Sequence, residues 1–375
     1  MQAFKQRHSF VRLAAAGVLL AGAAQAHATS YAYRDLGTMG GNYSDAKAIN
    51  ATGLVAGNAT NSGNVIHATV WGSNDTGVLL PLAGPKANSW AMGMNDAALV
   101  AGYSIAQGGN YHANVWVGGT LVDIGTLGGS NSYAVGINNA GQVVGTSDLA
   151  GDHASHGTLW SGGSLIDMGT LGGNNSVAKA LNDHGQVAGY SYIAGDRYLH
   201  ATSWDRGRLV DLGTLGGNES TAWGINNLGA VVGTALLAGN GGAHAASWWL
   251  GGVADLGTLG GRSSGAYGIN MSNLVVGQSQ YDASGFWHAT LWDTAGGIFD
   301  LNDYMDASLA QAGWVAYIAT DINDAGWIVG SAYNTNTFET HGFLLSVAAV
   351  PEPETYALLL AGLGVIGFVS RRRLA

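Results

Sequence analysis

Seven histidines recur at almost constant spacing along the chain, and histidine is the side chain most often used to bind metals or to transfer protons. Each follows a recurring asparagine by 17 or 18 residues. A zinc ion needs ligand nitrogens about 2.0–2.1 Å away, but equivalent atoms on a ring of repeats stand far apart unless they lie on its axis. We therefore expect no metal site. We interpret the repeated histidines as hydrogen-bonding scaffold residues: His67, His112, His156, His200, His244, His288 and His341.

A tryptophan follows the histidine by four residues in six of the seven repeats, and Leu345 takes this place in the last one. Repeated aromatic side chains of this kind pack well between neighbouring sheets. We therefore expect packing between repeats for Trp71, Trp116, Trp160, Trp204, Trp248 and Trp292.

An aspartate also recurs, usually in the phrase DLG, and a carboxylate can bind calcium or act as an acid or base. The chain has no DxDxDG loop, and carboxylates repeated around a ring do not form one paired acid and base. The GTLGG phrases lack the lysine and helix of a phosphate-binding loop. We therefore expect no catalytic residue and no cofactor in this chain. We predict that the repeated aspartates cap turns: Asp35, Asp123, Asp167, Asp211, Asp255 and Asp300.

The segments before each histidine differ most between repeats, so a specific site is expected there. Aromatic side chains among Asn, Ser and Gly can stack on sugar rings. Two interpretations remain open: a glycan-contacting surface, or solvated loops with scattered aromatic residues. The candidate contacts are Tyr111, Tyr192, Arg197, Tyr198, Tyr281 and Trp287.

The elements that must position these residues follow from the repeat. We take the asparagine that precedes each repeated histidine by 17 or 18 residues as the reference asparagine of its repeat. These asparagines lie 43–45 residues apart, with a last interval of 53. The third repeat holds four strand candidates, TLVDIG, YAVGIN, QVVGTS and HGTLW, and its NNAG phrase is typical of a hairpin. The pattern predicts an all-β fold over residues 29–349: a seven-bladed β-propeller of seven four-stranded repeats, each of about 44 residues. An open β-solenoid is the alternative.

The last repeat is longer, and its phrase MDASLAQAG predicts a short helix that either plugs the channel or covers the seam of the ring.

Composition agrees with an all-β chain. The 375 residues include 61 Gly, only 4 Pro and 47% hydrophobic residues, so a core can form. There is no cysteine, which excludes disulfides, thiolate metal sites and cysteine nucleophiles. The net charge of −10 argues against a nucleic-acid partner.

Both ends of the chain have the pattern of targeting segments. Residues 1–28 combine a basic start, an apolar run and small-x-small cleavage patterns, which predicts a secretory signal peptide removed by signal peptidase. Residues 350–375 combine a short Pro-Glu motif, an apolar segment over 356–370 that we predict to be a transmembrane helix, and three arginines. The motif residues are Val350, Pro351, Glu352, Pro353, Arg371, Arg372 and Arg373.

This C-terminal layout resembles the PEP-CTERM sorting signal of exopolysaccharide-producing Gram-negative bacteria. The resemblance implies recognition by a membrane exosortase, removal of the tail and transient inner-membrane association of the precursor. The alternative is a plain C-terminal anchor.

The phrases DLGTLGG, IN-x-x-G-x-V-x-G and HA-x-x-W over residues 31–346 resemble the HAF repeat of extracellular bacterial proteins. Most repeats depart from it at the third position, where Thr, Ala or Asn stands, and two read HGT and HGF. The resemblance implies an exported protein and carries no catalytic residues over.

Three function classes follow. The first is a non-catalytic protein of the cell surface or extracellular matrix that binds exopolysaccharide, another envelope glycan or biofilm material. The second is an extracellular polysaccharide lyase or glycosidase on a propeller scaffold. The third is an ice- or surface-adsorbing protein, for which one threonine per repeat is a sparse array.

Overall fold

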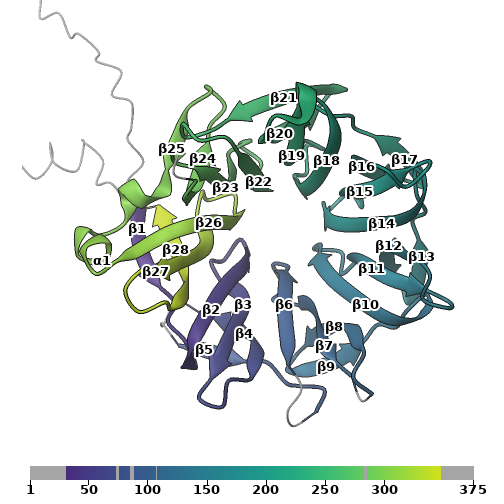
Figure 1. The fold of residues 1–375 in the computed structure, drawn as a ribbon. Coiled ribbons are helices and arrows are strands. Elements are labelled where there is room, and N and C mark those ends of the chain that lie inside the picture. Colours follow the sequence, from purple (N-terminus) through teal and green to yellow (C-terminus); the bar gives the residue numbers. More distant parts are fainter. Residues whose placement is uncertain (1–30, 73–75, 85–87, 107, 283–284, 348–375) are drawn as a thin grey trace, which may run out of the picture.

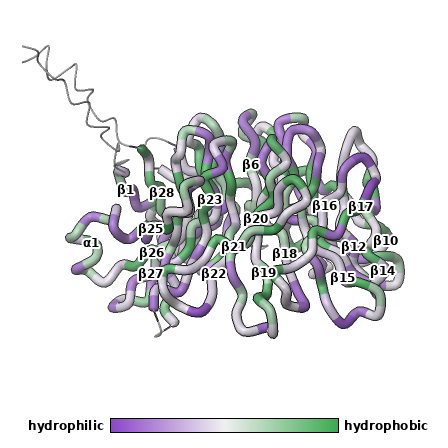
Figure 2. The backbone as a smooth tube through the Cα atoms, turned by 90° about the horizontal axis from the view of Figure 1, so that it is seen from above, coloured by the Kyte–Doolittle hydropathy of each residue, from purple (hydrophilic) through white to green (hydrophobic). Residues whose placement is uncertain are grey.

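β-Sheets stand around a central axis, and their strands follow one another from the centre outward (Figure 1). The computed structural model describes residues 31–347 except 73–75, 85–87, 107 and 283–284. Seen from the side, hydrophilic segments collect at the two flat faces of the ring and hydrophobic segments lie between them (Figure 2).

Five of the sheets are separate blades of four strands in chain order. The first two are β6 (Ser89–Met94), β7 (Val100–Ile105), β8 (Tyr111–Val117), β9 (Thr120–Asp123), and β10 (Gly128–Ile137), β11 (Val143–Leu149), β12 (Ser155–Ser161), β13 (Ser164–Asp167). The next two are β14 (Gly172–Leu181), β15 (Val187–Ile193), β16 (Leu199–Asp205), β17 (Arg208–Asp211), and β18 (Gly216–Ile225), β19 (Val231–Leu237), β20 (Ala243–Trp249), β21 (Gly252–Gly257). The fifth is β22 (Ser264–Ile269), β23 (Val275–Gln280), β24 (Trp287–Trp292) and β25 (Ile298–Asp300).

The remaining strands form one eight-stranded sheet that joins the two ends of the described chain. Its last-repeat strands are β26 (Trp314–Ile322), β27 (Ile328–Asn334) and β28 (Thr340–Val347), and its first-repeat strands are β2 (Gly40–Ile49), β3 (Val55–Asn61), β4 (Ile66–Trp71) and β5 (Gly77–Leu79). Strand β1 (Tyr31–Asp35) pairs antiparallel with β28, and a parallel bridge joins Tyr43 of β2 to Thr340 of β28.

The all-β propeller prediction therefore needs a correction in its blade count. Five four-stranded blades are present, not seven, because the strands of the first and last repeats belong to one eight-stranded sheet. The bridge between β2 and β28 depends on contacts between residues almost 300 positions apart, which a repeat pattern does not contain. The predicted signal peptide and the predicted sorting helix over 356–370 lie outside the described residues.

The phrase TLVDIG, expected as the first strand of the third repeat, supplies β9, the last strand of the preceding blade. The hairpins between the first and second strands of the blades use the expected turn chemistry. In the third repeat, the Asn138 side-chain Oδ1 accepts a hydrogen bond from Gln142 N at 2.9 Å, and Gly141 adopts a φ of 75°. A side chain with a Cβ is strained at such a φ, so glycine suits this position.

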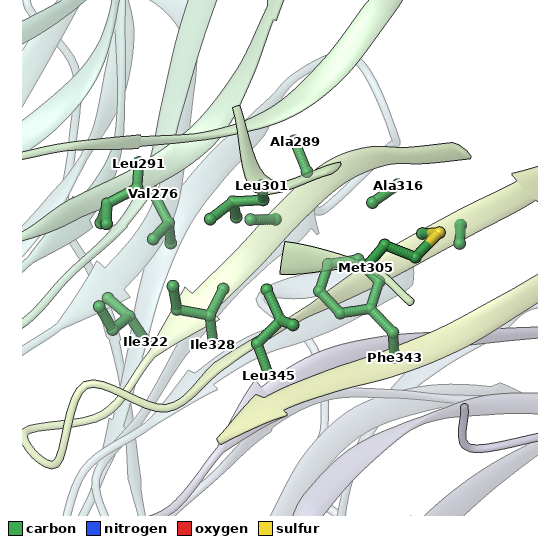
Figure 3. Packing of buried hydrophobic residues seen from close by; sticks show 12 residues of the cluster. Val276, Ala289, Leu291, Leu301, Met305, Ala316, Ile322, Ile328, Phe343 and Leu345 are labelled. Atoms are coloured by element: carbon green, nitrogen blue, oxygen red, sulfur yellow. The ribbon is translucent and has the colours of Figure 1, made fainter. Parts of the chain in front are cut away.

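Buried alanines and tryptophans fill the space between adjacent sheets. Trp160 is 7% exposed and donates its indole N–H at 2.6 Å to Ile124 O, which directly follows β9 of the preceding blade. A larger cluster joins the sixth and seventh repeats, where Phe343 and Leu345 pack with Met305 (Figure 3). Packing across neighbouring sheets thus buries apolar side chains around the ring.

Helical segments in the described part of the chain are short: η1 (Ala238–Asn240), η2 (Leu301–Tyr304) and α1 (Ala307–Gln311). The last repeat does contain the predicted helix, but α1 lies at the outer edge and does not plug the channel (Figure 1). Instead, η2 reaches strand β1 at the seam, where the rings of Tyr304 and Tyr31 lie 5.0 Å apart. Within the described residues, no helix has the length and apolarity needed to cross a membrane.

Candidate binding channel

The innermost strands of the seven repeats surround the axis of the ring (Figure 1). Each of them ends on an aliphatic residue followed by the reference asparagine, which is buried in every repeat. The side-chain Nδ2 of each asparagine donates to the backbone carbonyl of the next one at 3.0–3.4 Å, and Asn323 closes the circle on Asn50. We call this set the asparagine ring: Asn50, Asn95, Asn138, Asn182, Asn226, Asn270 and Asn323.

A cavity of about 220 Å³ lies against the asparagine ring. In several repeats the residue directly after the ring asparagine has a carboxylate or amide side chain. This side chain accepts a hydrogen bond from a backbone N–H of the preceding repeat, as Asp96 does from Ala51 N at 2.8 Å. Asp183 accepts from the amide groups of both Asn139 and Asn227, and hydrogen bonds of this kind lower its pKa against the opposing effect of burial. These polar groups are all engaged in contacts between repeats.

The aliphatic residues before the asparagines separate this cavity from a second one. All seven line the first cavity, and five of them also line the second. The seven are Ile49, Met94, Ile137, Leu181, Ile225, Ile269 and Ile322.

The second cavity has a volume of about 370 Å³ and is lined by the residues where the repeats differ. The residue three positions before each asparagine lies in its wall: Lys47, Met92, Val135, Lys179, Trp223, Tyr267 and Thr320. The next residue is Gly or Ala in six repeats, because the neighbouring inner strand is close. A Cβ on Gly224, for example, would lie 2.6 Å from Tyr267 O.

Asp321 is the exception at that small-residue position. Its Oδ2 accepts from Ile49 N and its Oδ1 from Ile322 N, both at 2.9 Å. The side chain keeps some accessible surface because it lines the cavity, but protein surrounds it closely, and this burial raises the pKa of Asp321 to about 6. Asp321 is thereby tied to the seam between the last and first repeats.

Two lysines line the same cavity in different ways. Lys47 forms an ion pair with Asp45 at 2.9 Å. Lys179 instead lies over aromatic rings, 4.7 Å from the ring centre of Trp223 and 5.8 Å from that of Tyr190. Burial lowers the pKa of Lys179 below its ordinary value.

An aromatic cluster is formed by residues of strands β6, β7, β8 and β10, toward the ends of the inner strands opposite the asparagine ring. Trp90 stacks on Tyr103 at 5.0 Å, Tyr103 meets Tyr133 edge-on at 5.1 Å, and Tyr111 lies 5.6 Å from Tyr133. We call these four residues the aromatic cluster. Each of them keeps some accessible surface.

Polar groups stand beside the aromatic cluster. Asn131 accepts from Tyr111 N at 3.0 Å and donates to Asp148 at 2.8 Å. Burial and the nearby Asp148 carboxylate raise the pKa of Tyr133.

The six residues predicted from the sequence to contact a glycan do not lie together in the structure. Tyr111 belongs to the aromatic cluster, whereas the Arg197 guanidinium lies 5.0 Å from the Tyr198 ring centre in the fourth repeat. In the sixth repeat Tyr281 stacks on His288 at 4.7 Å. Tyr192 and Trp287 are half-buried, in the fourth and sixth repeats respectively. The six residues thus occupy three separate repeats.

The repeated histidines lie against the repeated aspartates. In six repeats the ring Nδ1 stands 2.5–3.0 Å from an aspartate oxygen, and His341 reaches Asp35 across the seam. All six of these aspartates also accept from the backbone N–H two residues later, which caps the turn. His67 differs because the second repeat has no such aspartate, and its Nε2 lies 3.1 Å from Asn61 Nδ2.

Sequence reasoning missed the residues of the second cavity because it searched the loops for differences between repeats. Their signal lay inside the strand phrases DAKAIN, WAMGMN, YAVGIN, VAKALN, TAWGIN, GAYGIN and IATDIN. In these phrases the residue three before the asparagine varies widely, whereas the residue before it is always Ala and the residue after it is Gly or Ala in six of seven. Among the described residues, no group of three His, Asp or Glu side chains is placed to hold a metal ion.

Residues 349–373 match the PEP-CTERM protein-sorting motif, which confirms the predicted motif at this end. The match indicates an exported protein that exosortase processes and that is sorted to the surface of a Gram-negative bacterium. No curated protein is similar to the chain in sequence. The resemblance to HAF repeats is untouched by these findings and stays a prediction.

Several solved structures resemble the chain at low similarity. TolB from Acinetobacter baumannii matches 80% of this chain, which spans 64% of the TolB chain, with 13% identity and a TM-score of 0.44. Trypanosoma rangeli sialidase matches 85%, over 55% of its own chain, with 10% identity and a TM-score of 0.38. A fungal lectin from Aleuria aurantia matches 87%, over 97% of its own chain, with 11% identity and a TM-score of 0.37. Similarity this low carries no argument about function.

Proposed function

We propose that this exported chain is a non-catalytic glycan-binding protein of the cell surface or extracellular matrix, and that the aromatic cluster contacts the glycan. The single observation that carries this proposal is the group of four mutually packed, partly accessible aromatic rings. Aromatic faces pack against the C–H faces of sugars, and neighbouring polar groups bind the hydroxyls. Asn131 and Asp148 supply polar groups of that kind.

The scaffold itself does not require these aromatic residues. Trp90 and Tyr133 each lie five residues before a reference asparagine, where the next three repeats have Val177, Thr221 and Gly265. The same strand geometry is therefore built with small side chains elsewhere in the ring. A role outside the scaffold explains why large rings gather at one place.

The cavity chemistry favours binding over catalysis. Asp321 is the only carboxylate among the described residues that line the second cavity, and two backbone N–H groups hold its oxygens. Glycosidases generally use a pair of carboxylates on either side of the scissile bond. Exosortase-dependent sorting would bring the protein to the exopolysaccharide of the same cell.

The proposal is tested by titrating the purified mature protein with exopolysaccharide of the bacterium that encodes it, using calorimetry together with an assay for released sugar ends. We expect saturable binding without product. The double variant W90A/Y111A should bind roughly tenfold more weakly or worse, because it removes two rings of the cluster. Phe338→Ala is the matched control, since this ring is 72% exposed in the last repeat.

Equal binding by a correctly folded W90A/Y111A variant and the wild type would overturn the proposal. Released sugar ends would instead favour the polysaccharide-degrading alternative. Circular dichroism and thermal unfolding show whether each variant is folded.

A further inference from the structure

Lys179 is a half-buried cation in the wall of the second cavity. Among the described residues, no carboxylate lies within 4.0 Å of its Nζ, although Lys47 in the same wall has Asp45 as its partner. The Nζ is instead attracted to the face of the Trp223 ring. Lys179 lines the cavity, and no described residue forms a hydrogen bond with its Nζ.

The scaffold does not explain a lysine at this position. The equivalent residues of other repeats include Met92, Val135 and Thr320, so charged, apolar and polar side chains are all accepted. Burial without a counter-charge disfavours the charged ammonium, as the lowered pKa of Lys179 reflects. A half-buried cation whose donors find no acceptor among the described residues is a natural partner for an anionic group.

Other charges of the cavity do not neutralise it. Asp321 comes from the seventh repeat and Lys179 from the fourth, so they lie on different parts of the wall, and the Asp321 oxygens accept from Ile49 and Ile322. The aromatic rings of Trp223 and Tyr267 lie in neighbouring positions of the same wall and contact each other at 5.9 Å. One cation is thus combined with two aromatic side chains.

We propose that Lys179, Trp223 and Tyr267 form a subsite for the carboxylate-bearing sugar of an acidic polysaccharide, with the carboxylate at Lys179 and the sugar ring beside the aromatic side chains. This inference rests on the proposed glycan-binding function and specifies its ligand class. The cavity of about 370 Å³ falls within the roughly 300–1,000 Å³ of small-molecule pockets. The net charge of −10 repels an anionic ligand, so Lys179 supplies a local attraction for the carboxylate that the chain as a whole does not.

The test compares short oligogalacturonates with the same oligosaccharides after reduction of their carboxyl groups, titrated against the full mature protein by calorimetry. The wild type should bind the acidic form at least about tenfold more tightly than the reduced form, because only the acid can pair with Lys179. Lys179→Met keeps the length of the side chain and removes its charge, so it should abolish this preference. Arg208→Met removes the same charge from the exposed outer strand β17 and should keep it.

The outcomes separate this inference from the proposed function. Equal affinity of the wild type for both oligosaccharides, combined with weaker binding by W90A/Y111A, would overturn the Lys179 subsite and leave glycan binding intact. A Lys179→Met variant that retained the preference would also overturn the subsite. Failure of the wild type to bind either oligosaccharide or the native exopolysaccharide would overturn both.

Discussion

At the scale of single residues, Asp321 shows how one substitution in a repeat alters the chemistry of the channel. Six repeats place Gly or Ala at this position, where the adjacent inner strand approaches closely. The carboxylate fits because it accepts hydrogen bonds from Ile49 and Ile322 instead of clashing with that strand. Its ionisation nevertheless takes place in a confined space, which gives the ring a pH-dependent component of stability.

We predict that Asp321→Asn removes a pH dependence of stability between about pH 4 and pH 6. An aspartate in an unfolded chain ionises near pH 4, whereas the pKa of Asp321 in the folded protein is about 6. The folded state binds more protons in this window, so the free energy of unfolding falls as the pH rises through it, by roughly 3 kcal/mol at most. Urea unfolding at several pH values measures this slope.

Asp324→Asn is the control, because that carboxylate is exposed and lies three residues away. If the wild type and Asp321→Asn showed parallel stability curves from pH 4 to pH 7, the raised pKa would be wrong.

At the scale of elements, the seam depends on strand β1. It covers the outer side of β28, where Tyr33 stacks on the fully buried Phe343 at 5.7 Å. Asp35 at its end accepts from His341 of the last repeat. The first residues of the described chain therefore complete a sheet built mostly from its last residues.

Deleting mature residues through Asp35 should destabilise the ring by several kcal/mol, because two tyrosine side chains lose their packing and an edge of β28 is exposed, at about 1.5–3 kcal/mol per large side chain. Thermal unfolding and the free energy of unfolding in urea measure the loss. Asp35→Asn keeps the strand and weakens only the polar contacts of this side chain with His341 and with Gly37 N, so it should cost much less. A truncated protein as stable as the wild type would show that β1 contributes little to closure.

The sequence was informative at this scale where local chemistry decides the structure. The Asn-Gly turns, such as Asn138 with Gly141, predict their hairpins because positive φ and side-chain capping are local properties. The merging of two repeats through Tyr43 and Thr340 could not be predicted, because it depends on how the ring closes. The same holds for the aromatic cluster, in which Tyr111 meets Trp90 and Tyr133 only after neighbouring repeats pack.

At the scale of the whole molecule, the asparagine ring joins every repeat to the next by equivalent hydrogen bonds. Lys179 could not be recognised from the sequence because a lysine between alanines within a strand resembles an exposed surface residue. Only the circular arrangement brings it into one wall with Trp223 and Tyr267.

We predict that deletion of residues 351–375 changes the location of the protein and leaves the ring folded. The matched sorting motif covers residues 349–373, and the described strands end at Val347. Fractionation of cells that express either form should show surface material only for the complete chain. The melting temperature of the truncated protein should equal that of the mature wild type. Unchanged surface display of the truncated form would contradict the role of the motif.

The pairing of Tyr31 with Val347 has a mechanical consequence for a protein with targeting segments at both ends. The described chain begins on β1 and ends on β28, and these two strands pair near the rim of the ring. A tether attached through the C-terminal end would therefore hold the ring at its rim. Both flat faces of the ring would then be free of the tether. A force applied through the tether would act on β28, which is paired on both sides, with β27 and with β1.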